Sequence, residues 1–401
     1  MASNNVGGLT CENRGSIMDC FCDTTITGYY RVGGLAGRNI GTITNSVSTS
    51  VIKHSGANNL ATSEIGGLVG SQGFGSVLNS FWNKEISSIT RSGGGVGKTT
   101  AQMQDPNLYL NAGWDFLGEK KNGVSELWQM PSDGGYPVLG VLHGYVPPAL
   151  QGAGLPDDPY LITTPEELGA VRYHPGGSYR LDADIDLSGM GWSSALIPAF
   201  AGTFDGQGHR IGNLSINGGA YLGLFGRLSH AVVTNLGLDA VNIVSSGSYI
   251  GGLAGHNYLG MVANCYSTGS IGQYASYAGG LLGYHYYGML SDSYSTVAIS
   301  GPSAVGGLVG YNYNGTIENC YSTGAVSGEI NAGGLVGGKY YGATLNSFWD
   351  IDTSGMEESN GGRGMGTIYM KNPNTYINAG WDLDSIWSVL SGHYPRLQWE
   401  L

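Results

Sequence analysis

Tyrosine recurs at one fixed position in the second half of the chain. Four tyrosines follow the start of a Gly-Gly pair by seven residues: Tyr258, Tyr286, Tyr313 and Tyr340. If the segments that carry them stack on one another, the rings form a column, and stacked rings contribute about 0.5–1.5 kcal/mol per pair. Such a column is explained by packing alone, but it would also offer a platform for sugar rings. Both interpretations stay open, and the candidate ligand-binding residues are these four tyrosines with His256 and His285.

Acidic residues gather early in the second half. Asp182, Asp184 and Asp186 alternate along the sequence, which places the three carboxylates on one face of a strand. That face would bind Ca²⁺, serve catalysis, or be a solvated face that discourages pairing of a sheet edge. Asp205 and His209 follow in sequence.

A second acidic loop contains Asp350, Asp352, Glu357 and Glu358. If the chain is an enzyme, the predicted catalytic carboxylates are Asp184, Asp205 and Asp350.

The signatures of an enzyme are otherwise missing from the sequence. No Lys or Arg lies between Arg227 and Lys339, so this stretch lacks the base and the cations that a polysaccharide lyase needs. Its few acids do not form the close pair that glycoside hydrolysis needs. No H-E-x-x-H occurs, and the phosphate-loop-like segment 92–99 has Ser at its first required Gly, which favours a turn.

Composition excludes several classes of protein. The 401 residues include 71 Gly, carry a net charge of −12 and have only 17 Lys and Arg, so nucleic-acid binding is not expected. No apolar stretch is long enough to span a membrane as a helix. The start at Met1 lacks the features of a signal peptide. Five cysteines without a C-x-x-C pair argue against a zinc site, and Ca²⁺ is the only cofactor considered.

Internal repetition decides the fold. A Gly-Gly-Leu unit begins at Gly251, Gly279, Gly306 and Gly333, with spacings of 28, 27 and 27 residues. Short runs of Val, Ile, Leu and Tyr between Gly and Asn predict strands separated by turns. One unit cannot bury its apolar face alone, so successive units must stack as the coils of a solenoid.

Two columns within the repeat support this stacking. Asn or Asp recurs once per unit and predicts an internal amide ladder at a turn: Asn213, Asn235, Asn264, Asp292, Asn319 and Asn346. Cys265 and Cys320 would lie two coils apart, about 9–10 Å, which is too far for a disulfide. We therefore expect both to be buried and unbridged.

The chain resembles the GLUG-motif proteins, which are named for the G-G-L-x-G core of each repeat. The residues that carry the resemblance are Gly306–Gly310, Asn319–Gly324 and Ser347–Asp350. The resemblance implies a right-handed parallel β-helix (β-solenoid), extracellular and often part of bacterial adhesins or placed beside peptidase domains.

A longer repeat divides the chain into two tandem solenoid modules. Residues 66–116 match 333–383 at a constant offset of 267, and each copy ends in a Trp-rich tail that would cover the open end of a solenoid. Thr164-Pro165 predicts the start of a helix in an N-terminal cap. The predicted domains are 1–145 (partial module), 146–157 (linker) and 158–401 (complete module, with cap 158–216, coils 217–347 and tail 348–401).

The sequence thus predicts an all-β, non-catalytic, extracellular or cell-surface module. It would act as an adhesive or scaffolding element, with polysaccharide or a cell-surface glycan as the partner of the tyrosine column. Two alternatives stay open: a polysaccharide-active enzyme on a β-helix, and a fibre element that associates end to end through an uncapped first coil.

Overall fold

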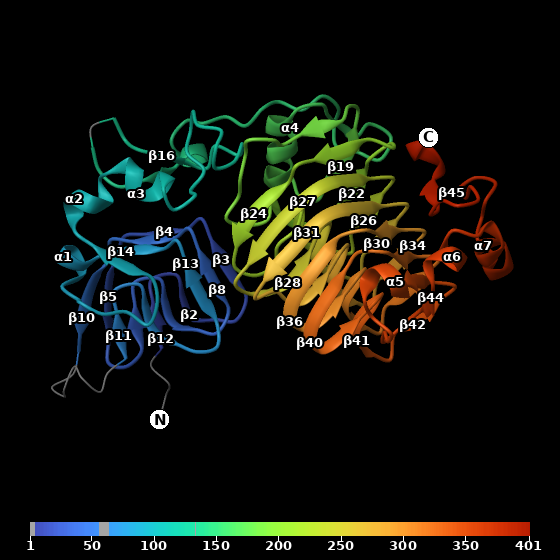
Figure 1. Cartoon of the computed structure of the whole chain (residues 1–401). Helices are drawn as coiled ribbons and strands as arrows, with labels where there is room; N and C mark the ends of the chain where they lie inside the picture. The colour runs from blue at the N-terminus through green and yellow to red at the C-terminus, as the bar shows by residue number, and fades with distance from the viewer. Residues whose placement is uncertain (1–4, 56–63, 133) are drawn as a thin grey trace. The chain divides into compact units, whose positions relative to one another are not determined.

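The computed structural model describes residues 5–55, 64–132 and 134–401; residues 1–4, where no signal peptide is expected, lie outside them. The chain divides into two compact units, Met1–Pro147 (unit 1) and Pro148–Leu401 (unit 2). The division falls within the segment predicted as a linker. Each unit is a stack of parallel β-coils, which confirms the predicted β-solenoid (Figure 1).

Each coil of unit 2 adds strands to three parallel sheets. The first sheet runs β21 (Ile197–Phe200), β25 (Phe225–Ser229), β29 (Ala254–Tyr258), β33 (Leu282–Tyr286), β37 (Val309–Tyr313) and β41 (Val336–Tyr340). The second runs β18 (Tyr160–Ile162), β19 (Ser178–Leu181), β22 (Thr203–Asp205), β26 (Val232–Thr234), β30 (Met261–Ala263), β34 (Met289–Ser291), β38 (Thr316–Glu318) and β42 (Ala343–Leu345).

The third sheet is the most extensive. Its main path runs β20 (Ile185–Asp186), β23 (Arg210–Gly212), β27 (Gly237–Ser245), β31 (Tyr266–Gln273), β35 (Tyr294–Ser295), β39 (Tyr321–Ser322), β43 (Phe348–Asp350) and β44 (Arg363–Met365). Attached to it are β24 (Ser215–Gly218), β28 (Ser248–Gly251), β32 (Ser276–Gly279), β36 (Ala298–Gly306) and β40 (Val326–Gly333).

Unit 1 has the same plan with fewer coils. Its parallel strands are β1 (Val6–Gly7), β6 (Val32–Gly33) and β11 (Ile65–Gly66); β2 (Thr10–Asn13), β7 (Ala36–Asn39) and β12 (Val69–Gln72); β3 (Ser16–Met18), β8 (Thr42–Thr44) and β13 (Ser76–Leu78); β4 (Phe21–Cys22), β9 (Val47–Ser48), β14 (Phe81–Asn83) and β15 (Val96–Lys98); and β5 (Thr25–Gly28) with β10 (Val51–His54).

Short helices and one antiparallel strand pair make up each tail. In unit 1 these are α1 (Lys84–Ser87), α2 (Thr100–Met103), α3 (Pro106–Leu110), β16 (Trp128–Gln129), β17 (Val138–Leu139) and η1 (Gly140–Leu142). In unit 2 they are α5 (Ile351–Ser354), α6 (Thr367–Met370), α7 (Pro373–Ala379), β45 (Trp387–Ser388), β46 (Arg396–Leu397) and η3 (Gln398–Glu400). Unit 2 also contains α4 (Pro165–Ala170) and η2 (Val171–Tyr173) near its start.

The Gly-Gly pair of each coil is fixed by close backbone approach. A Cβ on Gly307 would overlap the Gly334 carbonyl oxygen of the next coil and the Ser322 side chain. The hydroxyl of Ser322 donates to that same Gly334 carbonyl at 2.6 Å. The corner of the coil therefore excludes any side chain, while the following Leu308 points inward and is fully buried.

Cys265 and Cys320 are buried and unbridged, as predicted. Each occupies an inward position after the asparagine corner, and each backbone N–H donates to a serine hydroxyl one coil away, Ser293 for Cys265 and Ser347 for Cys320, at 3.1 Å in both cases.

The amide ladder exists, but its membership differs from the prediction. Asn235 donates to Asp205 at 2.9 Å, Asn264 donates to Asn235 at 3.1 Å, and Asn319 donates to Asp292 at 3.1 Å. Asn213 instead follows β23 and bonds Asp186, because it lies at a different corner of the coil. The ladder lies at partly exposed corners with left-handed backbone rather than inside the coil.

The start of unit 2 is more regular than the predicted cap. α4 begins as expected, with Thr164 at the N-cap and a capping box to Glu167. Residues 178–216, however, supply the first strands of the first and third sheets and two strands of the second sheet, which β18 begins. The cap is thus confined to β18 and the helices α4 and η2.

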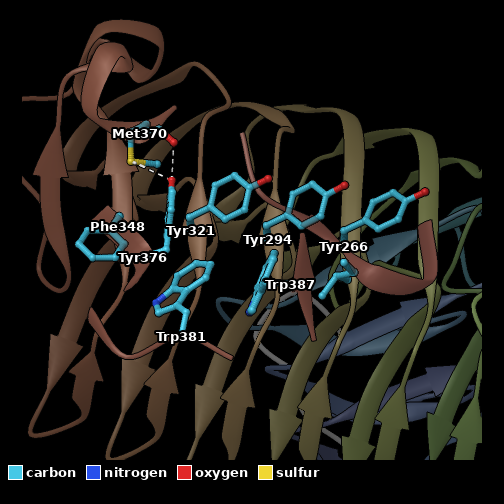
Figure 2. Close-up of a cluster of buried hydrophobic side chains, with 9 residues drawn as sticks. Tyr266, Tyr294, Tyr321, Phe348, Met370, Tyr376, Trp381 and Trp387 are labelled. Carbon is cyan, nitrogen blue, oxygen red and sulfur yellow. Dashed lines mark hydrogen bonds between the residues drawn. The ribbon is translucent and has the colours of Figure 1, made fainter. Parts of the chain in front are cut away.

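Each Trp-rich tail adds one parallel strand to its unit and also packs against the coils. Beyond the last coil, each unit has one further parallel strand, β15 in unit 1 and β44 in unit 2. Residues 96–98 of the phosphate-loop-like segment 92–99 form this closing strand of unit 1. The rest of each tail packs on the flank of the coils rather than over their end. In unit 2 it buries a column of aromatic rings (Figure 2): Tyr266, Tyr294, Tyr321 and Phe348 against Tyr376, Trp381 and Trp387.

Candidate binding surface

The predicted tyrosine column is present on the first sheet of unit 2. Tyr258 and Tyr286 stack with ring centroids 5.2 Å apart, Tyr286 and Tyr313 at 5.0 Å, and Tyr313 and Tyr340 at 4.8 Å, with interplanar angles of 10°, 17° and 23°. The parallel register of β29, β33 and β37 places Tyr258, Tyr286 and Tyr313 opposite one another. We call these four residues the first column.

A second column lies two residues earlier on the same strands, so its side chains share the face of the first column. Tyr284 and Tyr311 stack at 5.5 Å with an angle of 4°, and His256 meets Tyr284 edge-on at 5.3 Å. The site predicted from the sequence did not include Tyr284 and Tyr311.

A third column lies just before these strands. Tyr221 stacks on Tyr249 at 4.8 Å, and Tyr249 stacks on Tyr277 at 5.2 Å. Tyr277 contacts Tyr284 and Tyr311 edge-on at 5.7 and 5.6 Å, so the columns are continuous. We call the three columns together the tyrosine wall.

The geometry of the wall determines what it offers to a ligand. Because neighbouring rings in the first column stack face to face, most ring faces are occupied by the column itself. Ring edges and phenolic hydroxyls are left for other molecules. The rings are half-buried from Tyr258 to Tyr313, while Tyr340 is 45% exposed and the flanking Tyr341 is 79% exposed.

The two predicted histidines lie on opposite faces of the first sheet. His256 belongs to the second column, and its Nε2 is buried without a hydrogen-bond partner. His285 lies inside the coil, fully buried, with Nδ1 3.1 Å from Asn257 Nδ2 and Nε2 3.3 Å from the Thr316 carbonyl oxygen. The prediction that His285 contacts a ligand is therefore wrong, because the period-two alternation of β33 turns it away from Tyr284 and Tyr286.

Burial keeps both imidazoles neutral. It lowers the pKa of His285 to about 4. It also lowers the pKa of His256 to about 4, with further contributions from the charges of Arg227 and His285. Arg227 itself lies over the Tyr258 ring, with its guanidinium carbon 5.2 Å from the ring centroid.

The early acidic residues do not share a strand face. Only Asp186 lies in a strand, because the chain turns between β19 and β20 where Asp182 and Asp184 stand. Asp184 accepts from the Arg210 N–H and lies beside His209 Nδ1, both at 3.0 Å. Burial acts to raise the pKa of Asp184, but these two hydrogen bonds outweigh it and lower the pKa overall.

Asp186 is held by the side chain of Asn213 and by Ser188, which lower its pKa. Asp182 lies 3.3 Å from Arg180. Throughout the described part of the chain, no three His, Cys, Asp or Glu side chains come together so as to hold a metal ion.

The three acids named for catalysis have separate structural partners. Asp205 begins the amide ladder. Asp350 is fully buried at the N-cap of α5 and accepts hydrogen bonds from the Asp352 N–H at 2.9 Å and from the Tyr394 hydroxyl at 2.6 Å. Asn83 fills the equivalent N-cap of α1 in unit 1, so an amide serves there as well as a carboxylate. The predicted catalytic set of Asp184, Asp205 and Asp350 is therefore not assembled at one place.

Several clefts border the tail of unit 2, and the sequence analysis missed two of them that bear on binding. One, of about 560 Å³, is lined largely by polar residues that include Asn372, Asn374, Asn378 and Arg363. The other, of about 300 Å³, lies between the buried aromatic column and the tail. Neither could be read from spacing, because the lining residues meet only through the fold of the tail.

Three of the repeated coils match a known sequence motif. The model of the GLUG motif matches residues 28–53, 246–272 and 301–327. This chain carries GLUG motifs. The matched segments are coils of both units, including those that carry Tyr249, Tyr258 and Tyr311.

Two similar proteins share about a third of their aligned residues with this chain. A protein of Evansella cellulosilytica, provisionally named a Gly-rich membrane protein, is 37% identical over 128 residues, which is 28% of this chain and 15% of that protein. Halomucin of Haloquadratum walsbyi is 36% identical over 140 residues, which is 30% of this chain and 2% of that protein. The chain thus matches a small part of each relative.

A solved structure shows the same fold. It is a crystal structure from Bacteroides ovatus, provisionally titled an immunoglobulin A1 protease, with a TM-score of 0.50 and 23% identity over 62% of this chain and 94% of that chain. The likeness concerns the fold alone. In the described part of the GLUG-repeat chain, no helix combines the length and the apolar character needed to cross a membrane.

Proposed function

We propose that this protein is an adhesive scaffold module of a surface or secreted protein, and that its tyrosine wall binds glycans. The observation that carries the proposal is the wall itself, three continuous aromatic columns on one face of unit 2. A relative provisionally named a membrane protein supports the proposed location.

The backbone under the third column supports a role beyond packing. Tyr221, Tyr249 and Tyr277 have φ of 57°, 68° and 50°, the left-handed region that bulky residues avoid. The equivalent position of a later coil holds Asn331, which adopts this conformation at lower cost. A tyrosine at this position strains the backbone. A role in binding would explain why tyrosine is present despite that strain.

The chemistry of the wall suits neutral sugars. No Lys or Arg lies between Arg227 and Lys339, so most of the wall carries no cation. The first column presents hydroxyls at the spacing of the stacked rings, about 5 Å, and each hydroxyl both donates and accepts hydrogen bonds. An extended chain of sugar hydroxyls is the complementary partner.

Affinity electrophoresis of the full chain through gels that contain neutral polysaccharides tests the proposal. The Tyr286→Phe/Tyr313→Phe variant removes two hydroxyls and keeps both rings, so the stack persists. We expect at least one polysaccharide to retard the wild type, with an association constant about thirtyfold lower for the variant, since each of the two lost hydrogen bonds contributes about 1 kcal/mol.

The matched control is Tyr29→Phe, an exposed tyrosine of unit 1 that lies outside the wall. It should migrate like the wild type. Absence of retardation for every polysaccharide, or equal retardation of the wild type and the double variant, would overturn the proposal.

A further inference from the structure

The cleft between the buried aromatic column and the tail gathers positive charge in a chain that has little of it. Lys371, His393 and Arg396 of the tail line it, together with the hydroxyl-bearing Thr268 and Thr296 of the coils. The whole chain has only 17 Lys and Arg against 29 Asp and Glu. Two of these cations and a histidine therefore converge on one cavity of about 300 Å³.

Within the described residues, neither Lys371 nor Arg396 forms an ion pair, and no Asp or Glu lines the cleft. Lys371 is held in place by the ring of Tyr394, with Nζ 4.7 Å from the centroid.

Glu400 is the carboxyl group that acts on Arg396, and it is already engaged. It accepts from the Tyr294 hydroxyl at 2.9 Å and from the Leu397 N–H at 2.7 Å. Burial raises the pKa of Glu400, against the opposing effects of these hydrogen bonds and of Arg396. Glu400 thus already accepts from two hydrogen-bond donors, and it is not among the residues that line the cleft.

The duplicated tail of unit 1 shows that the fold does not need these charges. Lys371 is the C-cap of α6, and Gln104 is the C-cap of the equivalent α2. Arg396 pairs with Ser388 in the strand ladder, and Val138 takes the same place opposite Gln129. The tail of unit 1 has the same fold with neutral residues at these two positions. The charges of Lys371 and Arg396 are therefore not needed for the tail to fold.

We propose that this cleft binds the carboxylate or sulfate group of an acidic saccharide. A lysine and an arginine that form no ion pair within the described residues provide charge-assisted hydrogen bonds to an oxyanion, and the two threonine hydroxyls can bond the sugar. A cleft of about 300 Å³ is at the small end of ligand sites and fits one sugar ring. Among the described residues that line this cleft, none belongs to the tyrosine wall.

Calorimetric titration of the full chain tests this site, with trigalacturonate as the carboxylate probe, a 6-sulfated N-acetylglucosamine as the sulfate probe and maltotriose as the neutral probe. We expect one or both acidic probes to bind at low salt, binding to weaken in 0.5 M NaCl, and maltotriose not to bind this cleft. The Lys371→Gln/Arg396→Val variant installs the residues of unit 1 and should bind at least tenfold more weakly.

Two control variants locate the binding. Arg363→Val also installs the unit 1 residue, Val96, but removes a cation that lines the larger cleft, and it should bind like the wild type. Tyr286→Phe/Tyr313→Phe should also bind acidic probes normally, which separates this proposal from that of the wall. Absence of binding by both acidic probes, equal binding by Lys371→Gln/Arg396→Val, or loss in Arg363→Val instead would overturn the inference.

Discussion

The amide ladder of unit 2 is interrupted at two places, since the side-chain oxygens of Asn264 and Asn319 are both buried without a hydrogen-bond partner. At Asp292 the ladder has a carboxylate, which accepts from Asn319 but has no N–H to donate to Asn264. Asn264 Oδ1 is accordingly buried without a hydrogen-bond partner. An unmade hydrogen bond of this kind costs about 1–3 kcal/mol.

Asp292→Asn should therefore stabilise the protein. The new amide would keep its oxygen for Asn319 and for Trp387 Nε1, and donate to Asn264. We expect the free energy of unfolding to rise by about 1 kcal/mol, measured as a higher urea midpoint. Asn319→Asp, which removes a donor from the next rung, should lower the midpoint. A lower midpoint for Asp292→Asn would contradict the ladder geometry.

His285 should make the protein sensitive to acid. Its pKa is lowered to about 4 in the folded state against 6.5 for the free side chain. Between these values the unfolded chain binds a proton that the folded chain excludes, so the free energy of unfolding falls as pH falls from 6.5 to 4. The full loss is about 3 kcal/mol.

Comparison with His285→Asn isolates this contribution. Asn257 and Asn312 occupy the same inward position in the adjacent coils, so the substitution suits the site. Urea midpoints at pH 7 and pH 4.5 should differ less for the variant than for the wild type. An equal acid sensitivity in both proteins would show that His285 is not the group responsible.

At the scale of the element, the Gly-Gly corner governs how closely coils can approach. Gly307→Ala would press a methyl group onto the Gly334 carbonyl of the next coil. We expect a loss of about 2 kcal/mol or more in the free energy of unfolding, as for other strained positions. Gly176→Ala, where nothing lies within 4 Å of the added methyl, is the matched control. Thermal unfolding that is equal for both variants would refute the close approach.

The elements show which features follow from sequence. Repeat spacing predicted the coils, the buried cysteines and the first tyrosine column, since stacked repeats place equivalent residues in register. Along a strand, a shift of one residue decides whether a side chain faces the inside of the coil or the solvent. The prediction for His285 was wrong for this reason. The cleft around Lys371 and Arg396 depends on a tail that folds back on the flank, and no local pattern encodes that contact.

At the scale of the whole molecule, comparison of the two duplicated units distinguishes the contacts that both units share from the features that only one unit has. Both tails bury a Tyr-Trp-Trp cluster with the same contacts, with Tyr109 and Trp114 at 4.8 Å in unit 1 and Tyr376 and Trp381 at 4.6 Å in unit 2. The tyrosine wall belongs to unit 2 only, since Ile40 and Gly73 stand where unit 1 would carry its column. Binding should therefore be a property of unit 2.

Hydroxyl-radical footprinting with and without a retained polysaccharide tests this account most directly, because it reads each tyrosine in the native chain. We predict that the polysaccharide protects Tyr286, Tyr313 and Tyr340 from oxidation and leaves Tyr29 and Tyr369 as reactive as before. Protection confined to tyrosines outside the wall, or unchanged oxidation of the first column under conditions of saturating binding, would contradict the claim that the tyrosine wall is the glycan-binding surface.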